Sequence, residues 1–249
     1  MPKSPFKVIF KKELIPKVYF VTFQAEYDSG YRAGQFFSIE VANKEFRPYS
    51  TVHCSRTPPI YFPETKALPV LEEGEYVSFM ISTKPGGIAS EYFDKVENNQ
   101  FTTGVGPSGS FRYYPNDRPK AFIATGTGLA PFVPMVEGIL KNNPLADLSV
   151  FFGCWKISDN FCEQFFPNFY NKPAYPNFKI YIVAEDIEGN PETNFLKEGR
   201  VTTVVPATIS EVKDSDYYIC GHPAMCTAME EVLKEHGCED NVFSEKFGK

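Results

Sequence analysis

The hydrophobic pattern of the first 115 residues is that of short, half-buried β-strands. Runs rich in Val, Ile, Phe, Tyr and Thr are separated by turn residues, and one helix-like stretch, residues 88–95, interrupts them. The predicted strands are residues 6–11, 18–25, 35–41, 49–53, 76–82 and 101–105. Regularly spaced strands of this length are typical of a β-barrel or a β-sandwich.

The pattern changes after a polar, proline-flanked segment at residues 115–119. The apolar runs beyond it are residues 121–124, 148–153, 178–184 and 217–220, and the helical stretches are residues 131–141, 160–170 and 223–236. Continuous apolar strands that alternate with helices form a parallel sheet covered on both faces. We therefore predict two domains: an antiparallel β-barrel over residues 1–116 and an α/β domain with a parallel sheet over residues 117–249.

Composition and charge exclude some classes of partner. Aromatic residues make up 16% of the chain, which is enough to fill a hydrophobic core. The 25 Lys and Arg residues against 31 Asp and Glu residues give a net charge of 25 − 31 = −6, and there is no basic block. Nucleic acids and anionic membrane surfaces both attract clustered positive charge, so neither is an expected partner.

The sequence contains no recognisable targeting or metal-binding pattern. The first residues lack the apolar segment and cleavage site of a signal peptide. The most apolar stretch, residues 121–140, contains prolines, glycines and a glutamate, unlike a membrane span. The six cysteines do not have the spacing of a zinc or iron–sulfur site. These features predict a cytoplasmic protein with reduced cysteines and no metal site.

A glycine-rich turn follows the first apolar run of the second domain. It comprises Thr125, Gly126, Thr127, Gly128, Leu129, Ala130 and Pro131. The two glycines allow a sharp turn and a close approach of a ligand, and Pro131 suits the start of a helix. The free amides at such a helix start favour an anion, for which a pyrophosphate is the natural candidate. The third glycine of the usual dinucleotide fingerprint is replaced by Pro131, and a strand–helix turn without a ligand is the alternative.

Two further motifs occur in the barrel. Arg47-Pro48-Tyr49-Ser50 ends one strand and offers a guanidinium for phosphate, a flat ring for stacking and a small hydroxyl. The second motif leads into the short helix and comprises Gly86, Gly87, Ile88, Ala89 and Ser90. Its glycines and helix start again expose backbone amides. An ordinary edge strand and a plain strand–helix turn are the respective alternatives.

The ordered set of motifs resembles the ferredoxin-NADP reductase superfamily of flavoprotein reductases. That family has the patterns R-x-Y-S/T, G-x-x-S/T, G-x-G-x-x-P and C-G-x-x-x-M in this order. The chain matches them with Arg47/Tyr49/Ser50, Gly87/Ser90, Gly126/Gly128/Pro131 and Cys220-Gly221-His222-Pro223-Ala224-Met225. Each motif is weak alone, but their order is specific and they span almost the whole chain.

The resemblance implies a flavin-binding barrel. Arg47 would bind the flavin diphosphate, the Tyr49 ring would pack on the isoalloxazine, and Ser50 would hydrogen-bond near flavin N5, with Pro48 inside the same motif. The loop from Gly86 to Ser90 would hold the pyrophosphate of FAD. This second phosphate site favours FAD over FMN, although relatives that use FMN exist.

The resemblance also implies a nicotinamide-nucleotide domain. The turn from Thr125 to Gly128 would hold the nucleotide pyrophosphate, and Cys220 and Gly221 would lie beside nicotinamide C4. Met225 belongs to this motif, although core packing is its more natural role. Ser50, Cys220 and Glu245 are the candidate catalytic residues. Phe247 is a candidate flavin lid, with packing of a terminal strand as an equal alternative.

The identity of the nicotinamide donor is addressed by the end of the third strand of this domain. Relatives specific for NADPH have Ser-Arg there, whereas this chain has Ala184 and Glu185, followed by Asp186. Two carboxylates repel a 2′-phosphate and accept hydrogen bonds from a ribose diol, which favours NADH over NADPH. Arg200 lies where some relatives keep a phosphate ligand and argues in the opposite direction.

The resemblance implies an FAD-dependent NAD(P)H oxidoreductase. Hydride would pass from nicotinamide C4 to flavin N5, and electrons would then pass to a separate redox carrier protein, such as ferredoxin, flavodoxin or an oxygenase component. Two alternatives stay open. One is a free-flavin or quinone reductase without a protein partner, and the other is a non-catalytic accessory subunit that binds nucleotide.

Overall fold

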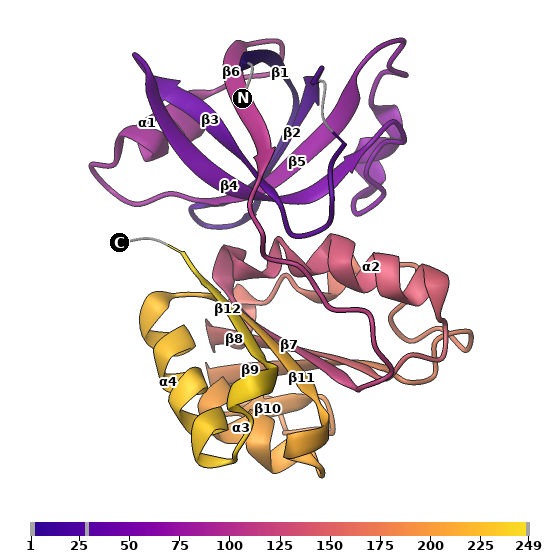
Figure 1. Ribbon diagram of the computed structural model, residues 1–249. Coiled ribbons are helices and arrows are strands. Elements are labelled where there is room, and N and C mark those ends of the chain that lie inside the picture. The colour runs from indigo at the N-terminus through magenta and orange to yellow at the C-terminus, as the bar shows by residue number, and fades with distance from the viewer. Residues whose placement is uncertain (1–2, 28–29, 248–249) are drawn as a thin grey trace. The chain divides into compact units, whose positions relative to one another are not determined.

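The computed structural model describes residues 3–27 and 30–247. The chain divides into two compact units, Met1–Arg112 and Tyr113–Lys249. Figure 1 shows the first unit as a β-barrel and the second as an open sheet flanked by helices. The predicted fold classes of both parts are confirmed. Among the described residues, no helix has the length and apolar character needed to cross a membrane.

The first unit is a closed barrel of six antiparallel strands in the order β1-β2-β5-β4-β3-β6. The strands are β1 (Lys3–Ile15), β2 (Val18–Ala25), β3 (Phe36–Ala42), β4 (Glu45–Ser55), β5 (Glu75–Ser82) and β6 (Phe101–Ser108), and the helix α1 is Ile88–Lys95. Pairing of β1 with β6 closes the barrel and so removes free sheet edges. The barrel is filled by inward-facing aromatic rings, such as Phe6 against Phe37 at 5.5 Å between centroids and Phe23 against Phe79 at 5.8 Å.

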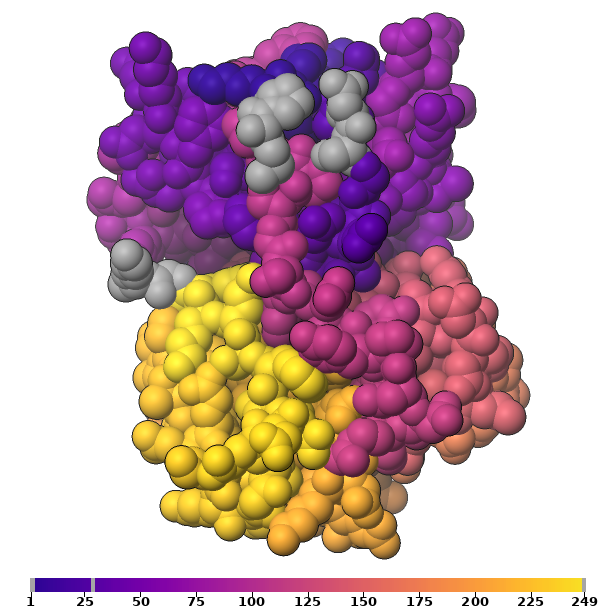
Figure 2. Space-filling view, viewed as in Figure 1, coloured from indigo at the N-terminus to yellow at the C-terminus, as the bar shows by residue number. Residues whose placement is uncertain are grey.

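The second unit is a six-stranded parallel sheet in the order β10-β9-β8-β7-β11-β12. Its strands are β7 (Lys120–Thr125), β8 (Leu148–Lys156), β9 (Phe178–Asp186), β10 (Leu196–Glu198), β11 (Asp216–Gly221) and β12 (Val242–Lys246). Its helices are α2 (Phe132–Asn142), α3 (Val201–Thr208) and α4 (Pro223–Glu235). Figure 2 shows α4 and β12, at the yellow end of the colour bar, on the surface of this unit.

The two faces of this sheet are covered by different helices. Alternate strand residues such as Ile123, Phe151 and Val183 form a core with α3 and α4. The intervening residues face the other way, where the Phe122 ring packs against Phe132 of α2 at 5.2 Å. A sheet buried on both faces explains why its strands are continuous apolar runs in the sequence.

The sequence prediction fails at four elements of the second unit. Residues 160–170 were predicted as a helix, but they form turns with one short 3-10 segment, Glu163–Phe165. Buried phenylalanines in this segment fill the core from irregular backbone, and their spacing in the sequence resembles that of a helix. Pro167 cannot continue a helix. The elements that were not predicted are β10, α3 and β12. α3 is rich in β-branched valines and contains Pro206, both of which disfavour a helix locally.

A buried charge cluster fixes the start of the second unit. Lys120 is 4% exposed and Asp216 is 2% exposed. Lys120 Nζ donates to the Asn116 carbonyl and side-chain oxygens at 3.0 and 2.7 Å, and lies 3.9 Å from the Asp216 carboxylate. The Arg118 guanidinium lies 2.9 Å from the Asp216 carboxylate, and Asn116 Nδ2 donates to that carboxylate at 2.8 Å. Burial lowers the pKa of Lys120, and Asp216 opposes that shift. The segment before β7 is thereby tied to the amino ends of β7 and β11.

The carboxyl ends of β7 and β11 are held together by direct backbone contact. A Cβ atom on Gly128 would overlap the Cys220 carbonyl, and a Cβ on Gly221 would overlap Thr125. His222 N donates to Thr125 Oγ1 at 3.1 Å. The two turns therefore interlock at a distance that only glycine permits.

Replacement of Gly128 by alanine tests this contact. We expect Gly128→Ala to lower the free energy of unfolding by about 1–3 kcal/mol, because the neighbouring backbone cannot yield to an added methyl group. Gly138→Ala is the matched control, since Gly138 lies inside α2 with open space around it. The control should be neutral or stabilising by about 0.5–1 kcal/mol. Denaturant unfolding followed by circular dichroism measures both variants, and equal stability of the two would contradict the interlock.

Candidate functional site

The Arg47–Ser50 motif lies on β4 inside the first unit. Strand alternation places Arg47 and Tyr49 on one face and Pro48 and Ser50 on the other. Arg47 is exposed, and its guanidinium bonds Glu45 at 2.7 Å and the Phe46 carbonyl at 2.9 Å. An exposed guanidinium held only by neighbours on its own strand is free to turn toward an incoming phosphate.

The Tyr49 ring connects this motif to the second barrel motif. It packs edge-on against Phe93 of α1 at 5.3 Å between centroids and lies 6.1 Å from Phe79. Burial raises the pKa of the Tyr49 hydroxyl, so the ring stays neutral. Because α1 begins directly after the Gly86–Gly87 turn, the two motifs lie on neighbouring elements of the same unit.

The Gly86–Ser90 loop is closed by its own serine. Ser90 Oγ accepts a hydrogen bond from Lys84 N at 2.7 Å, which leaves the hydroxyl proton to be donated. Gly86 has a φ of +74° with open space around it, and a Cβ on Gly87 would stand 3.0 Å from Ser90 Oγ. The first amides of α1, from Ile88 onward, have no acceptor within their own helix. The loop thus offers donors for an anion with oxygen atoms, such as a phosphate.

The side chain of Asp94, which the sequence analysis did not identify, holds α1 against the barrel. The Asp94 carboxylate accepts from Lys17 Nζ at 3.2 Å, Tyr19 OH at 3.0 Å and Thr83 Oγ1 at 3.1 Å. Desolvation alone would raise the pKa of Asp94, but these hydrogen bonds outweigh it and the pKa is lowered. Nothing local marks Asp94 in the sequence, because its partners lie as many as 77 residues away.

The glycine-rich turn of the second unit has one open side. Gly126 has a φ of +54°, and a Cβ added to it would meet open space. Gly126 and Thr127 are half-exposed. Gly128 is buried, so its close approach is to the Cys220 carbonyl of the protein itself. The predicted helix starts slightly later than expected, with Pro131 as the residue before α2. A ligand at this turn would therefore meet Gly126 and Thr127 rather than Gly128.

The structure brings Cys220, Glu245 and Phe247 to the end of β11. Cys220 is in register with Glu245 of β12, and Phe247 N donates to the Gly221 carbonyl at 2.9 Å. Burial raises the pKa of the Cys220 thiol well above its ordinary value, and the nearby Glu245 charge adds to this. Cys220 is therefore a neutral thiol. Met225 lies in the first turns of α4 and packs against the core.

The end of β9 carries an ion pair. Arg200 precedes α3, and its guanidinium lies 3.0 Å from the Glu185 carboxylate. Asp186 accepts a hydrogen bond from Glu188 N at 2.8 Å. Glu185, which favours NADH, and Arg200, which favours NADPH, thus form an ion pair with each other.

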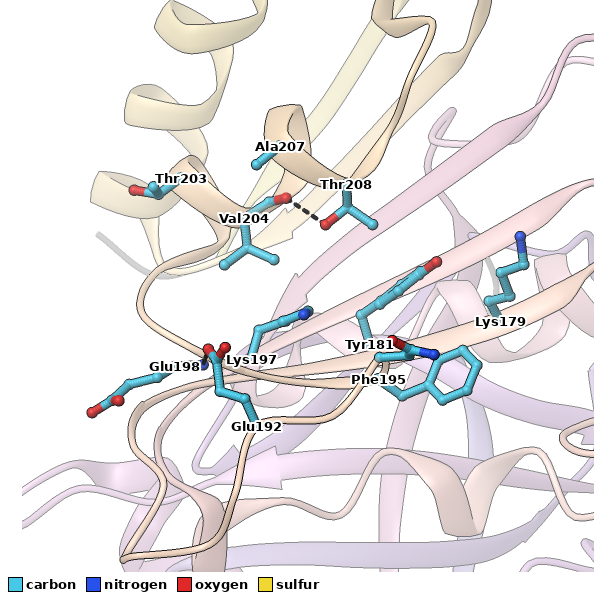
Figure 3. Close-up of a pocket in the computed structure, with 11 residues that line it drawn as sticks. Lys179, Tyr181, Glu192, Phe195, Lys197, Glu198, Thr203, Val204, Ala207 and Thr208 are labelled. Atoms are coloured by element: carbon cyan, nitrogen blue, oxygen red, sulfur yellow. Dashed lines mark hydrogen bonds between the residues drawn. The ribbon is translucent and has the colours of Figure 1, made fainter.

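A separate cavity of about 550 Å³ lies beside β9, β10 and α3 (Figure 3). Aromatic rings of Tyr181 and Phe195, the lysines 179 and 197, and α3 line it. None of the predicted site residues lines this cavity. Among residues 3–27 and 30–247, no three His, Cys, Asp or Glu side chains are grouped as a metal site would require.

Comparison with known proteins relates the chain to oxidoreductases. Residues 122–231 match the family described as the oxidoreductase NAD-binding domain. The toluate 1,2-dioxygenase electron transfer component of Pseudomonas putida is 28% identical over 178 residues, which cover 71% of this chain and 51% of that protein. NADH-cytochrome b5 reductase 1 of Dictyostelium discoideum is 28% identical over 224 residues, covering 86% and 71%. The chain thus spans only about half the length of the first of these relatives.

Solved structures show the same fold along the whole chain. The Amycolatopsis cytochrome P450 reductase superposes with a TM-score of 0.81 at 20% identity, covering 99% of this chain and 70% of that one. A ferredoxin NADP+ reductase from Neisseria gonorrhoeae, solved with FAD and NADP, gives 0.78 at 15% identity, covering 99% of each chain. The two-unit fold is thus that of these solved reductases, and the second unit matches the oxidoreductase NAD-binding domain family.

Proposed function

We propose that the chain is an FAD-dependent reductase that takes a hydride from NADH and delivers electrons to a separate redox carrier protein. The observation that carries this proposal is that each unit has a glycine-containing turn with accessible backbone directly before a helix. The first is the Ser90-closed loop before α1, and the second is the open Gly126–Thr127 turn before α2. Two nucleotide-type cofactors need two such turns.

The residues of the barrel fit FAD. Arg47 supplies a positive charge for one phosphate, and the α1 amides with the Ser90 hydroxyl supply donors for a second. The flat, neutral Tyr49 ring is braced edge-on by Phe93 and can serve as a stacking surface. Bound FAD would supply hydride acceptance and the stepwise release of electrons.

The residues of the second unit fit a nicotinamide nucleotide. Gly126 and Thr127 offer the exposed backbone of a strand–helix turn to the pyrophosphate. Cys220, as a neutral buried thiol beside Glu245, presents no negative charge of its own to the nicotinamide ring. Phe247 is held to Gly221 by its amide, so its ring stays close to the same strand end.

The carrier protein is proposed from the relatives. The Pseudomonas putida relative is named as an electron transfer component of toluate 1,2-dioxygenase, and another as the ferredoxin–NAD(P)+ reductase component of naphthalene 1,2-dioxygenase. We extend this role to the present chain, with a ferredoxin-type or flavodoxin-type protein, or an oxygenase component, as acceptor in the cytoplasm.

The proposed function is tested by anaerobic titration of FAD-loaded protein with NADH. We expect the visible flavin bands to bleach with one equivalent of NADH and to recover when an oxidised ferredoxin is added. A protein that binds no flavin after incubation with FAD would overturn the proposal. Reoxidation by free riboflavin or a quinone, but by no carrier protein, would instead favour the free-flavin or quinone reductase.

The choice of flavin is tested at Arg47 and Ser90. We expect Arg47→Ala to weaken binding of both FAD and FMN about 10- to 100-fold, because a charge-assisted phosphate contact is lost. Ser90→Ala should weaken binding of FAD alone, because only FAD has the second phosphate. Arg56→Ala is the control for charge, since Arg56 is exposed on the same unit. Fluorescence titration of the apoprotein measures all three variants, and equal losses for FAD and FMN in Ser90→Ala would contradict the FAD assignment.

The choice of NADH over NADPH is tested at Glu185. In the native protein the Glu185 carboxylate neutralises Arg200 and would repel a 2′-phosphate. We expect Glu185→Ala to release Arg200 and to raise kcat/KM for NADPH about tenfold or more, with a smaller fall for NADH. Glu198→Ala removes the same charge from the neighbouring strand, where Glu198 is in register with Ala184 and so faces away from Glu185. An equal gain in Glu198→Ala would show a general charge effect and contradict the role of the ion pair.

A further inference from the structure

The single tryptophan of the chain is placed where no packing role explains it. Trp155 lies near the carboxyl end of β8 and is 62% exposed. It makes no ring contact and no hydrogen bond within the described part of the chain. An exposed indole with an open face offers a flat surface on which a planar ring can stack.

The strand register places Trp155 beside the Glu185–Arg200 ion pair. Cys154 is in register with Ala184 and Lys156 with Asp186, so Trp155 lies opposite Glu185. Residues in register on parallel strands point to the same face of the sheet. Gly153, two residues earlier on the same face, adjoins Val201 at the start of α3.

The same edge carries the pyrophosphate turn on the other side of Trp155. Thr125, which precedes Gly126, also adjoins Gly153 and ends the neighbouring strand β7. Adjacent strands are about 4.8 Å apart, so the edge from Thr125 past Trp155 to Glu185 covers about 10 Å. The turn, the indole and the ion pair therefore lie along one short stretch of this edge.

We propose that Trp155 is the stacking surface for the adenine of the nicotinamide nucleotide. This inference rests on the proposed function and adds the adenine subsite to it. With the pyrophosphate at Gly126 and the ribose diol at Glu185, the base lies over the exposed indole. Stacking of a base on an aromatic ring contributes affinity without requiring a hydrogen-bond pattern.

The aromatic cavity of Figure 3 is the competing position for the base. Tyr181 and Phe195 lie 5.8 Å apart there. Tyr181 is four residues before Glu185, about 13 Å back along the strand, and α3 stands above that part of the sheet. An adenine whose ribose is at Glu185 reaches Trp155 directly, but it would have to leave the strand ends to reach the cavity.

The experiment uses the FAD-loaded protein and 5′-AMP as the probe. Because Trp155 is the only tryptophan, its emission reports on this position alone. We expect AMP and NAD+ to change the emission and reduced nicotinamide mononucleotide, which has no adenine, to leave it unchanged. Calorimetry should show AMP binding about tenfold weaker in Trp155→Ala, within about threefold of native in Trp155→Phe, and unchanged in Phe195→Ala.

Steady-state kinetics give a second readout. In Trp155→Ala we expect a higher KM for NADH with an unchanged kcat, and native kinetics with reduced nicotinamide mononucleotide. Native AMP affinity in Trp155→Ala, or weaker affinity in Phe195→Ala instead, would overturn the inference and move the base elsewhere. These outcomes differ from failure of the proposed function, in which NADH would leave the flavin oxidised in every variant.

Discussion

The candidate site of the second unit depends on the backbone contact between two turns. Gly128 and Cys220 touch through main-chain atoms, and Thr125 and Gly221 fit together beside them. Residues about 90 positions apart in the chain are thereby fixed at van der Waals distance. Because neither turn can move without the other, the open Gly126 backbone keeps a constant position relative to Cys220. A reaction between two bound cofactors requires this kind of constancy, since a displacement of about 1 Å is costly.

The barrel also holds its candidate loop in a fixed position, but through side-chain packing and hydrogen bonds. Its closed strand order removes edges, and its core of phenylalanine rings leaves little freedom to the strands. The helix α1, which follows the Gly86–Gly87 turn, is then attached to the barrel by Asp94, which accepts hydrogen bonds from Tyr19 of β2, from Thr83 after β5 and from Lys17. The loop can thus be built from small residues, while its position is determined by charged and polar side chains outside it.

Two groups of paired charges in the second unit differ in their exposure to water. Lys120 and Asp216 are buried together with Asn116 and Arg118, because removal of either partner would leave an uncompensated charge in the interior. At the opposite edge of the sheet, Arg200 and Glu185 are paired but exposed, so they remain accessible to a ligand. The buried ion pair therefore stabilises the interior of this unit, whereas the Arg200–Glu185 pair is reached by water.

Local sequence determined most of the elements and the order of the motifs. The range of β2 follows from a run of β-branched and aromatic residues, and that of α1 from a helix-like stretch. The motifs around Arg47, Gly86, Gly126 and Cys220 are visible in the chain because each is contiguous. The helix expected at residues 160–170 failed, because burial of phenylalanines from turns imitates helical spacing. α3 and the edge strands β10 and β12 were missed, because their stability comes from the sheet they join rather than from their own residues.

Only the tertiary structure decided which residues act together. It explained why residue 128 is a glycine: Gly128 contacts a carbonyl far along the chain, which the sequence alone does not show. It paired Arg200 with Glu185, which the sequence had left as opposed arguments about the nucleotide. It also revealed the contacts of Asp94, which no motif marks, and the exposure of Trp155. A residue's propensity depends on its near neighbours, whereas its function here depends on register and packing between segments that are distant in sequence.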